Sequence, residues 1–189
     1  MTLPTPKKIC FEKSLYYFKK NKNTYAPCDC HNNTYLHFYD CNYEEVEKRE
    51  NDFTYITGLM IYNNGDNKYC VVHSWVEDNE MIIDTTSLAN SQLKLLSVFP
   101  KDYVKEIEEL LNNKISYIPY FSLSHKQFNA KCKELFIKSA YNEQEYIKAI
   151  ERYLVSITQS IEKDKGFMLT IETTLGCEFK KDGFHMEIK

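Results

Sequence analysis

The clearest pattern along the chain is an alternation of apolar and polar positions between residues 53 and 86. The runs read FTYITGLMIY, KYCVVHSWVE and EMIIDTT, and they are separated by the residues NNGDN and DN. Alternation with a period of two is typical of half-buried strands, and Asn, Gly and Asp between such runs favour tight turns. The pattern therefore predicts a three-stranded antiparallel meander.

Helical spacing of apolar residues brackets this meander. Before it, residues 9–20 and 30–41 show this spacing, and Asp29 is a candidate N-cap for the second helix. After it, Pro100 can open the helix KDYVKEIEELLNN, and Ser124 can cap HKQFNAKCKELFIKSA. The segment NEQEYIKAIERYLVSITQSIEK predicts a third helix here, with one stripe that faces the core or, as an alternative, a dimer partner. This stripe consists of Ile147, Ile150, Leu154, Ile157 and Ile161.

The end of the chain returns to a strand pattern. Gly166 is expected to end the long helix, FMLTIETT reads as a strand, and CEFK-KDG-FHMEI reads as a hairpin whose turn centres on Asp182 and Gly183. No repeat and no Gly/Ser-rich linker divides the chain. We therefore expect one α+β domain over residues 1–189, with a helical elaboration over 101–163 and C-terminal strands over 167–188.

Composition narrows the functional class. The 189 residues are 43% hydrophobic and 27% charged with a net charge of -3, so nothing draws the chain as a whole to nucleic acid. No run approaches the roughly 20 apolar residues of a membrane helix, and no secretory signal pattern is present. The seven cysteines are an odd number and read as reduced thiols. We expect a cytoplasmic protein with neither a nucleic-acid nor a membrane partner.

The meander brings a histidine and a carboxylate together. If Asp78 and Asn79 form a two-residue turn, paired positions sum to 157 and His73 lies opposite Asp84. Directly opposed residues hold their Cβ atoms roughly 4.5–5.5 Å apart, which allows an imidazole–carboxylate hydrogen bond. Apolar residues on the other face would fix this register. They are Val72, Val76, Met81 and Ile83.

A carboxylate on one ring nitrogen orients an imidazole and makes it a stronger base. Cys30 lies at the expected start of a helix, where backbone N–H groups and the helix dipole favour a thiolate. Cys30, His73 and Asp84 can therefore form a thiol, base and acid triad. The alternative interpretation is an ordinary polar cross-strand pair and an unrelated buried thiol.

A family resemblance favours the triad. HSWVEDNEMIIDTT resembles the segment of transglutaminase-like and papain-like cysteine hydrolases in which the catalytic His is followed by x-Trp and, after a short turn, by Asp and Thr. Upstream, the residues CHNN from Cys30 to Asn33 resemble the nucleophile helix of a small phage and bacterial branch. YITGLMIY resembles the strand with a central Gly that precedes the His strand there. The resemblance covers residues 27–86, the catalytic core region of the expected domain.

This resemblance implies a papain-like (transglutaminase-like) core, in which the nucleophile helix packs on an antiparallel sheet. It implies that Cys30 is the nucleophile, His73 the general base and acid, and Asp84 the orienting carboxylate. Trp75 would shield the dyad or line the acyl cleft, and Asn33 would support Cys30. The implied activity is that of a peptidase-like or amidase-like hydrolase or acyltransferase, acting on a peptide or amide through a thioester without cofactor or metal.

Other thiols and histidines offer competing sites. Cys28 is two positions from Cys30 and could be the reactive thiol instead. Cys177 and His185 share the terminal hairpin, although a three-residue turn does not place them opposite each other. A zinc site is disfavoured because C-x-C-H lacks the usual ligand spacing and no second Cys pair follows. Its ligands would come from Cys28, Cys30, His31, His37 and Cys41.

Two surface interpretations complete the sequence hypotheses. An N-terminal lysine cluster forms either a solvated face or a contact with an acidic partner. It consists of Lys7, Lys8, Lys13, Lys19, Lys20 and Lys22. The alternative to an enzyme is a catalytically weak binding protein that keeps the papain-like frame and contacts another protein through its helices, since a fold does not dictate one function.

Overall fold

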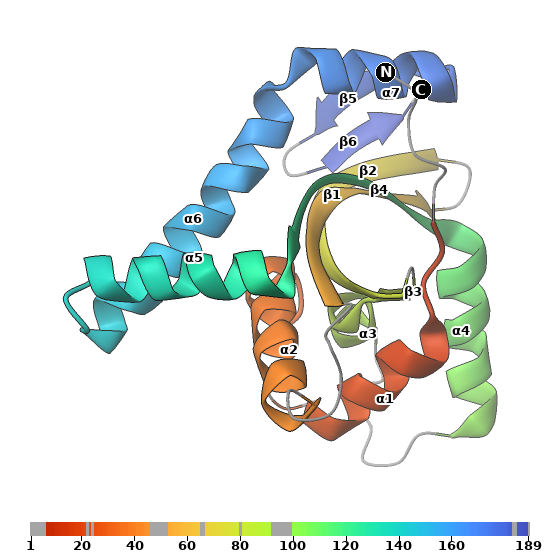
Figure 1. The fold of residues 1–189 in the computed structure, drawn as a ribbon. Helices are drawn as coiled ribbons and strands as arrows, with labels where there is room; N and C mark the ends of the chain where they lie inside the picture. The colour runs from red at the N-terminus through yellow and green to blue at the C-terminus, as the bar shows by residue number, and fades with distance from the viewer. Residues whose placement is uncertain are drawn as a thin grey trace.

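The structure is a computed structural model that describes residues 7–21, 23, 25–45, 53–64, 67–79, 81–91, 100–182 and 185–188. Helices and strands are mixed along this part of the chain (Figure 1). The helices are α1 (Phe11–Asn21), α2 (Cys30–Glu45), α3 (Thr85–Asn90), α4 (Lys101–Lys114), α5 (His125–Lys138), α6 (Glu143–Lys163) and α7 (Lys165–Leu175). The strands are β1 (Phe53–Asn64), β2 (Asn67–Asp78), β3 (Met81–Ile83), β4 (Ile115–Ser124), β5 (Phe179–Asp182) and β6 (His185–Ile188).

The strands form one antiparallel sheet in the order β4-β1-β2-β6-β5. β1 and β2 pair along their whole length, and the second edge of β2 is shared by two short strands. β6 pairs with residues 68–70 and β3 pairs with residues 76–78. Between them, over residues 71–75, none of the described strands pairs with this edge of β2.

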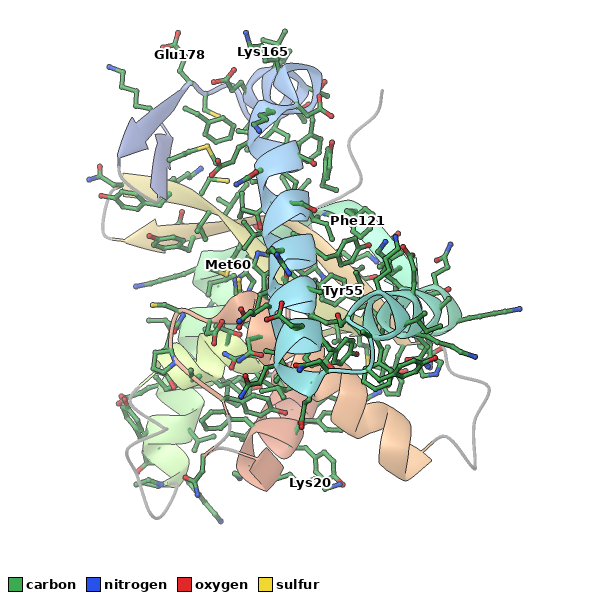
Figure 2. The ribbon with its side chains drawn as sticks, turned by 90° about the vertical axis from the view of Figure 1, so that its left-hand side faces the viewer. Lys20, Tyr55, Met60, Phe121, Lys165 and Glu178 are labelled. Carbon is green, nitrogen blue, oxygen red and sulfur yellow. The ribbon has the colours of Figure 1, made fainter. Side chains whose placement is uncertain are left out.

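The period of two in β1 and β2 separates two cores. On one face, Trp75 and Ile56 pack with side chains of α1, α3 and α4. On the other face, Tyr55 packs with α5 and α6, and Leu59 packs with α6 and α7. In Figure 2, α6 runs down the length of the molecule in front of the sheet, beside Tyr55 and with Lys165 at its upper end. The strongly curved sheet is therefore covered on both faces (Figure 1).

Helix α2 lies against the open part of the β2 edge. The Thr34 hydroxyl donates a 2.8 Å hydrogen bond to the carbonyl oxygen of Ser74, a backbone group of the edge that no described strand occupies. Leu36 packs against one core and Tyr35 against the other. The N-terminus of α2 thus meets the sheet at its edge, beside residues that point to either face.

The register of the β2–β3 hairpin differs from the prediction. Glu77 pairs with Ile82, so paired positions sum to 159 and the turn is displaced by one position from Asp78 and Asn79. The slip in register equals one full side-chain period, so each residue keeps the expected face. The third strand is also shorter than predicted, because it ends at Ile83 and Asp84 caps helix α3 instead.

Two of the expected segments have other secondary structure. The region 101–163 is not wholly helical, because it contains strand β4, in which Pro119 lies opposite Gly58 at a bulge. The predicted strand at 167–174 is wrong, since these residues belong to α7, which is capped by the Asp164 carboxylate and contains Gly166 near its start. The terminal hairpin of β5 and β6 is confirmed, and Gly183 lies outside the described residues.

The remaining predicted helices are confirmed. Ser124 forms a capping box with Gln127 at the start of α5. The apolar stripe of α6 faces the core as predicted from Ile150 to Ile161, whereas Ile147 is half exposed. In the described part of the chain, no helix is both long and apolar enough to cross a bilayer.

We predict that Gly58→Ala disrupts the centre of the sheet. A Cβ atom at this position would lie 2.1 Å from the Ile118 carbonyl oxygen and 2.9 Å from the Trp75 ring, so both must move. We expect the free energy of unfolding in urea to fall by about 2–4 kcal/mol, which is the range of severe overpacking.

The matched control for this substitution is Gly166→Ala in α7. Its added Cβ would meet only the Asp164 carboxylate at 3.4 Å, which is an ordinary contact. This variant should unfold at an unchanged or slightly higher urea concentration, because Ala is the better helix former. Equal stability of the two variants would contradict the close packing described for Gly58.

Candidate active site

Asp84 is positioned by the start of helix α3. Its backbone is extended (φ -130, ψ 97), and its Oδ1 atom accepts the backbone N–H groups of Thr86 at 2.9 Å and Ser87 at 3.0 Å. The Asp84 backbone N–H in turn donates to Ser14 Oγ in α1 at 3.0 Å. This N-cap geometry fixes the carboxylate and turns its Oδ2 atom toward β2 and β4.

Three side chains meet at Asp84 Oδ2. His73 Nε2 lies at 2.8 Å, the Tyr117 hydroxyl donates at 2.8 Å, and the Ser87 hydroxyl donates at 2.5 Å. Burial by itself would raise the pKa of the Asp84 carboxyl, but His73 and Ser87 together lower it to about 2. The carboxylate is therefore charged although it is almost wholly buried.

His73 projects from the centre of β2 and is also buried. Burial by itself would lower the pKa of its imidazole, but the Asp84 carboxylate and then Cys30 raise it to about 10. The Trp75 ring stacks nearly parallel to the imidazole with the ring centroids 6.5 Å apart, and Tyr117 flanks it at 6.2 Å. Since Nε2 is held by Asp84, Nδ1 is the ring nitrogen that remains for the thiol.

Cys30 is the first residue of α2, and its thiol lies near His73, where it contributes to the raised pKa of the imidazole. The contact is possible because α2 approaches β2 along the stretch of edge that no described strand covers. The thiol is partly exposed, as a reactive cysteine requires. The structure therefore brings Cys30, His73 and Asp84 together in the order that a catalytic triad needs.

Cys28, the competing thiol, occupies a different place. It is exposed and has a left-handed backbone (φ 57), and its N–H donates to Asn90 Oδ1 at 2.7 Å. It lines the same cleft as Cys30. The start of α2, with Cys30, is held at β2 through His31 and Thr34, whereas Cys28 is held at Asn90 of α3.

Trp75 shields the dyad from behind. The side chain is fully buried and does not line the cleft that Cys30 and His73 border. Its ring contacts Tyr117 edge to face at 5.1 Å, and its indole N–H donates to Glu77 Oε1 at 3.4 Å. Gly58 leaves the space in which this ring lies flat beside His73.

Asn33 supports the loop that leads to Cys30 rather than the dyad itself. Its side chain accepts the Ala26 N–H at 2.8 Å and donates to the Ala26 carbonyl oxygen at 2.6 Å. It also donates to the Thr86 hydroxyl at 3.0 Å. Fully buried, Asn33 therefore ties the turn before α2 to the helix that Asp84 caps.

His31 anchors the nucleophile helix, a role that the sequence did not indicate. Its Nδ1 atom lies 2.7 Å from Ser74 Oγ, and its Nε2 atom lies 2.5 Å from Thr158 Oγ1 in α6. Burial and the charge of His73 lower the pKa of His31 to about 4, although Asp29 opposes this shift. A neutral His31 can accept one hydrogen bond and donate the other, so it links β2, α2 and α6.

The residues considered for a zinc site or a second thiol–histidine pair either have structural roles or lie outside the described residues. No three His, Cys, Asp or Glu side chains of the described residues lie close enough together to hold a metal ion. His37 is buried 3.4 Å from the Tyr25 hydroxyl, and burial lowers its pKa to about 3. The side chains of Cys41 and His185 lie outside the described residues.

Two lysines of the N-terminal cluster form ion pairs within the protein. Lys7 pairs with Glu77 at 2.6 Å, and Lys13 pairs with Asp78. These two ion pairs hold the segment before and within α1 against the β2–β3 hairpin. Lys22 lies outside the described residues.

A cleft of about 1090 Å³ opens at the thiol. Cys30 and His73 lie in its wall, together with Thr86 and Ser87 from the start of α3. The rest of its lining comes mainly from β1, β2, α4, α6 and α7 and is largely apolar. Such a cleft gives a substrate access to the sulfur while Asp84 stays dry.

We predict that the His73–Asp84 pair gives stability a characteristic pH dependence. Folded His73 holds its proton up to a pKa of about 10, whereas its unperturbed pKa is 6.5. Its stabilisation is therefore complete below pH 6.5 and is lost as the pH rises toward 10. The contribution of Asp84 is lost only as the pH falls from 3.8 through about 2.

Urea unfolding at several pH values from about 7 to 8.5 tests this dependence. We expect the free energy of unfolding to fall by about 1.4 kcal/mol per pH unit, which corresponds to one linked proton. His73→Gln should abolish this slope. His125→Gln should preserve it, because the pKa of His125 is lowered and its imidazole does not titrate between pH 7 and 8.5. An identical slope in His73→Gln would contradict the assignment.

Comparisons with known proteins complete the description of the site. No protein-family model matches the chain. No curated protein matches it, and no solved structure does so.

Proposed function

We propose that the protein is a cysteine-dependent hydrolase or acyltransferase of papain-like (transglutaminase-like) type. The observation that carries this proposal is that one buried imidazole hydrogen-bonds to the Asp84 carboxylate and lies together with Cys30 in the wall of an open cleft. Its natural substrate class is an amide or peptide, because a thiol with a paired acid and base attacks acyl carbon.

The reaction follows from the positions of the three groups. Cys30 sulfur, having given its proton to His73, forms a bond to the substrate carbonyl carbon. His73 then returns that proton to the leaving nitrogen as its bond to carbon breaks, which leaves a thioester on Cys30. Water or a second amine next attacks the thioester carbonyl carbon and gives a proton to His73. The bond between that carbon and sulfur breaks, the acid or new amide leaves, and His73 returns the proton to the Cys30 sulfur.

Helix α2 supplies electrostatic support for this reaction. Its first N–H groups have no acceptor within the helix and point toward the start, where Cys30 lies. A developing oxyanion on the substrate carbonyl is stabilised by such donors and by the positive end of the helix dipole. Asp84 keeps His73 oriented and stabilises its protonated form throughout.

The arrangement of the elements supports the papain-like assignment. The nucleophile helix, the strand with a central Gly58, the histidine strand and the aspartate follow one another in the expected order. The nucleophile helix packs on an antiparallel sheet. The described cysteines are free thiols, as in a cytoplasmic protein.

A binding function remains the second candidate because of one surface feature. Several exposed apolar side chains gather around the connection between α5 and α6, at the tip that projects from the molecule in Figure 1. They are Phe136, Ile137, Tyr141 and Ile147. Such a patch is typical of protein contact surfaces, and a binding protein would need no reactive thiol.

Selective alkylation tests the proposed nucleophile. We expect iodoacetamide at neutral pH to label Cys30 much faster than the other thiols, and His73→Ala to slow that labelling by roughly 10²-fold because the base is lost. Labelling is read by mass spectrometry of peptides. Cys70 gives an internal reference, because burial raises its pKa to about 12.

Two further variants serve as controls for this experiment. Cys28→Ser should keep the rapid phase, and Cys30→Ser should remove it. His125→Ala, a histidine outside the site, should leave the labelling rate unchanged. Uniform reactivity of all thiols would exclude the enzyme and favour the binding function.

A further inference from the structure

We propose that the acyl group processed at Cys30 is a linear apolar chain, held in the arm of the cleft between helix α4 and strands β1 and β2. This proposal rests on the function proposed above and specifies its substrate class. The arm begins at the thiol and follows the face of the sheet that carries His73.

The lining of this arm is mainly apolar, with the hydroxyl groups of Tyr62 and Tyr103 as the polar atoms of its named residues. β1 and β2 contribute side chains from one face, and α4 contributes a stripe that faces them. Several of these side chains are only partly buried, so an apolar occupant would remove them from water. The lining residues of the arm are Met60, Tyr62, Val71, Tyr103, Ile107 and Leu111.

The chemistry of the arm favours a chain over a peptide. A peptide carries an amide at each residue that needs a hydrogen-bond partner, and a wall of side chains from a sheet face and a helix face does not provide them. Lys114, a charged side chain of the lining, is exposed at the end of α4. The unbranched Met60 lets the arm adapt to the methylene groups of a chain.

The other side of the cleft has a different character. Beyond Cys30 the lining passes to α6 and α7, where Glu162 offers a carboxylate beside Met168, and the Thr158 hydroxyl is hydrogen-bonded to His31. A polar leaving group or acceptor fits this side. The cleft therefore has an apolar arm on one side of the sulfur and a lining of mixed polarity on the other.

An activated ester or thioester of the chain is a suitable donor for this site. Cys30 sulfur forms a bond to the acyl carbon, the bond from that carbon to the leaving oxygen or sulfur breaks, and the leaving group takes the proton held by His73. The chain then resides in the arm as a Cys30 thioester, until water or an acceptor releases it with proton transfer to His73.

A chain-length series of p-nitrophenyl esters tests the proposal. Acetate, butyrate and octanoate esters are compared by the rate at which p-nitrophenolate is released in the first turnover, with the Cys30 adduct confirmed by intact mass. We expect the second-order rate constant to rise with each methylene, by up to about fourfold where the methylene is fully buried. A rate that does not rise with chain length would overturn the proposal.

Two matched substitutions test whether the preference for long chains comes from the arm. Ile107→Glu, at a half-buried position in the arm, should remove at least tenfold of the preference for octanoate over acetate, taken as the ratio of the two rate constants in the same variant. Ile147→Glu makes the same change at an exposed position of α6 outside the cleft and should leave the preference intact. An intact preference in Ile107→Glu would place the chain elsewhere and overturn the assignment of the arm.

The outcomes separate the two proposals. If neither iodoacetamide nor any ester modifies Cys30, the proposed function fails and the chain proposal fails with it. If iodoacetamide and acetate modify Cys30 but octanoate reacts no faster than acetate, only the chain proposal fails. The wild-type series gives this answer by itself, and Leu110→Glu provides a second, more exposed cleft position if Ile107→Glu does not fold.

Discussion

The buried carboxylate of Asp84 is the constraint on which the rest of the site depends. One oxygen accepts two backbone N–H groups at the start of α3, and the other gathers His73, Tyr117 and Ser87. A carboxylate in this position would be costly without such partners, because its charge has lost its water. These partners keep the Asp84 carboxylate charged, and its negative charge in turn stabilises the protonated form of His73. Four parts of the fold are thereby joined at one residue, because α3, β2 and β4 contact the Asp84 carboxylate and Ser14 of α1 accepts its backbone N–H.

A second constraint is the stretch of the β2 edge between β6 and β3. Over residues 71–75 no described strand pairs with it, and helix α2 lies there instead. The side chains of Thr34 and His31 bind the edge at Ser74. The start of α2 is therefore held beside the adjacent residue of β2, His73. The Cys30 thiol thus lies near the His73 imidazole, which is on the face of the sheet that carries Trp75. Tyr35 of the same helix, α2, packs against the core on the opposite face.

Sequence periodicity was sufficient for the His73–Asp84 contact, even though the predicted register was off by one side-chain period. A slip of that size preserves the face of every residue, and the N-cap geometry of Asp84 makes up the remaining distance. β4 could not be recognised in the same way, because Pro119 interrupts its pattern and its pairing with β1 is non-local. Tyr117 belongs to that strand, so this donor to Asp84 was missed together with it.

The place of β4 in the sheet has a consequence for the order in which the molecule acquires its chemistry. The chain carries Cys30, His73 and Asp84 in its first half, whereas Tyr117, which completes the hydrogen bonding of the acid, follows after helix α4. During synthesis on a ribosome, the three residues of the proposed triad emerge before the strand that finishes their surroundings. A nascent chain therefore holds an immature centre, and its maturation is coupled to closure of the sheet by long-range contacts, the slow class of folding event.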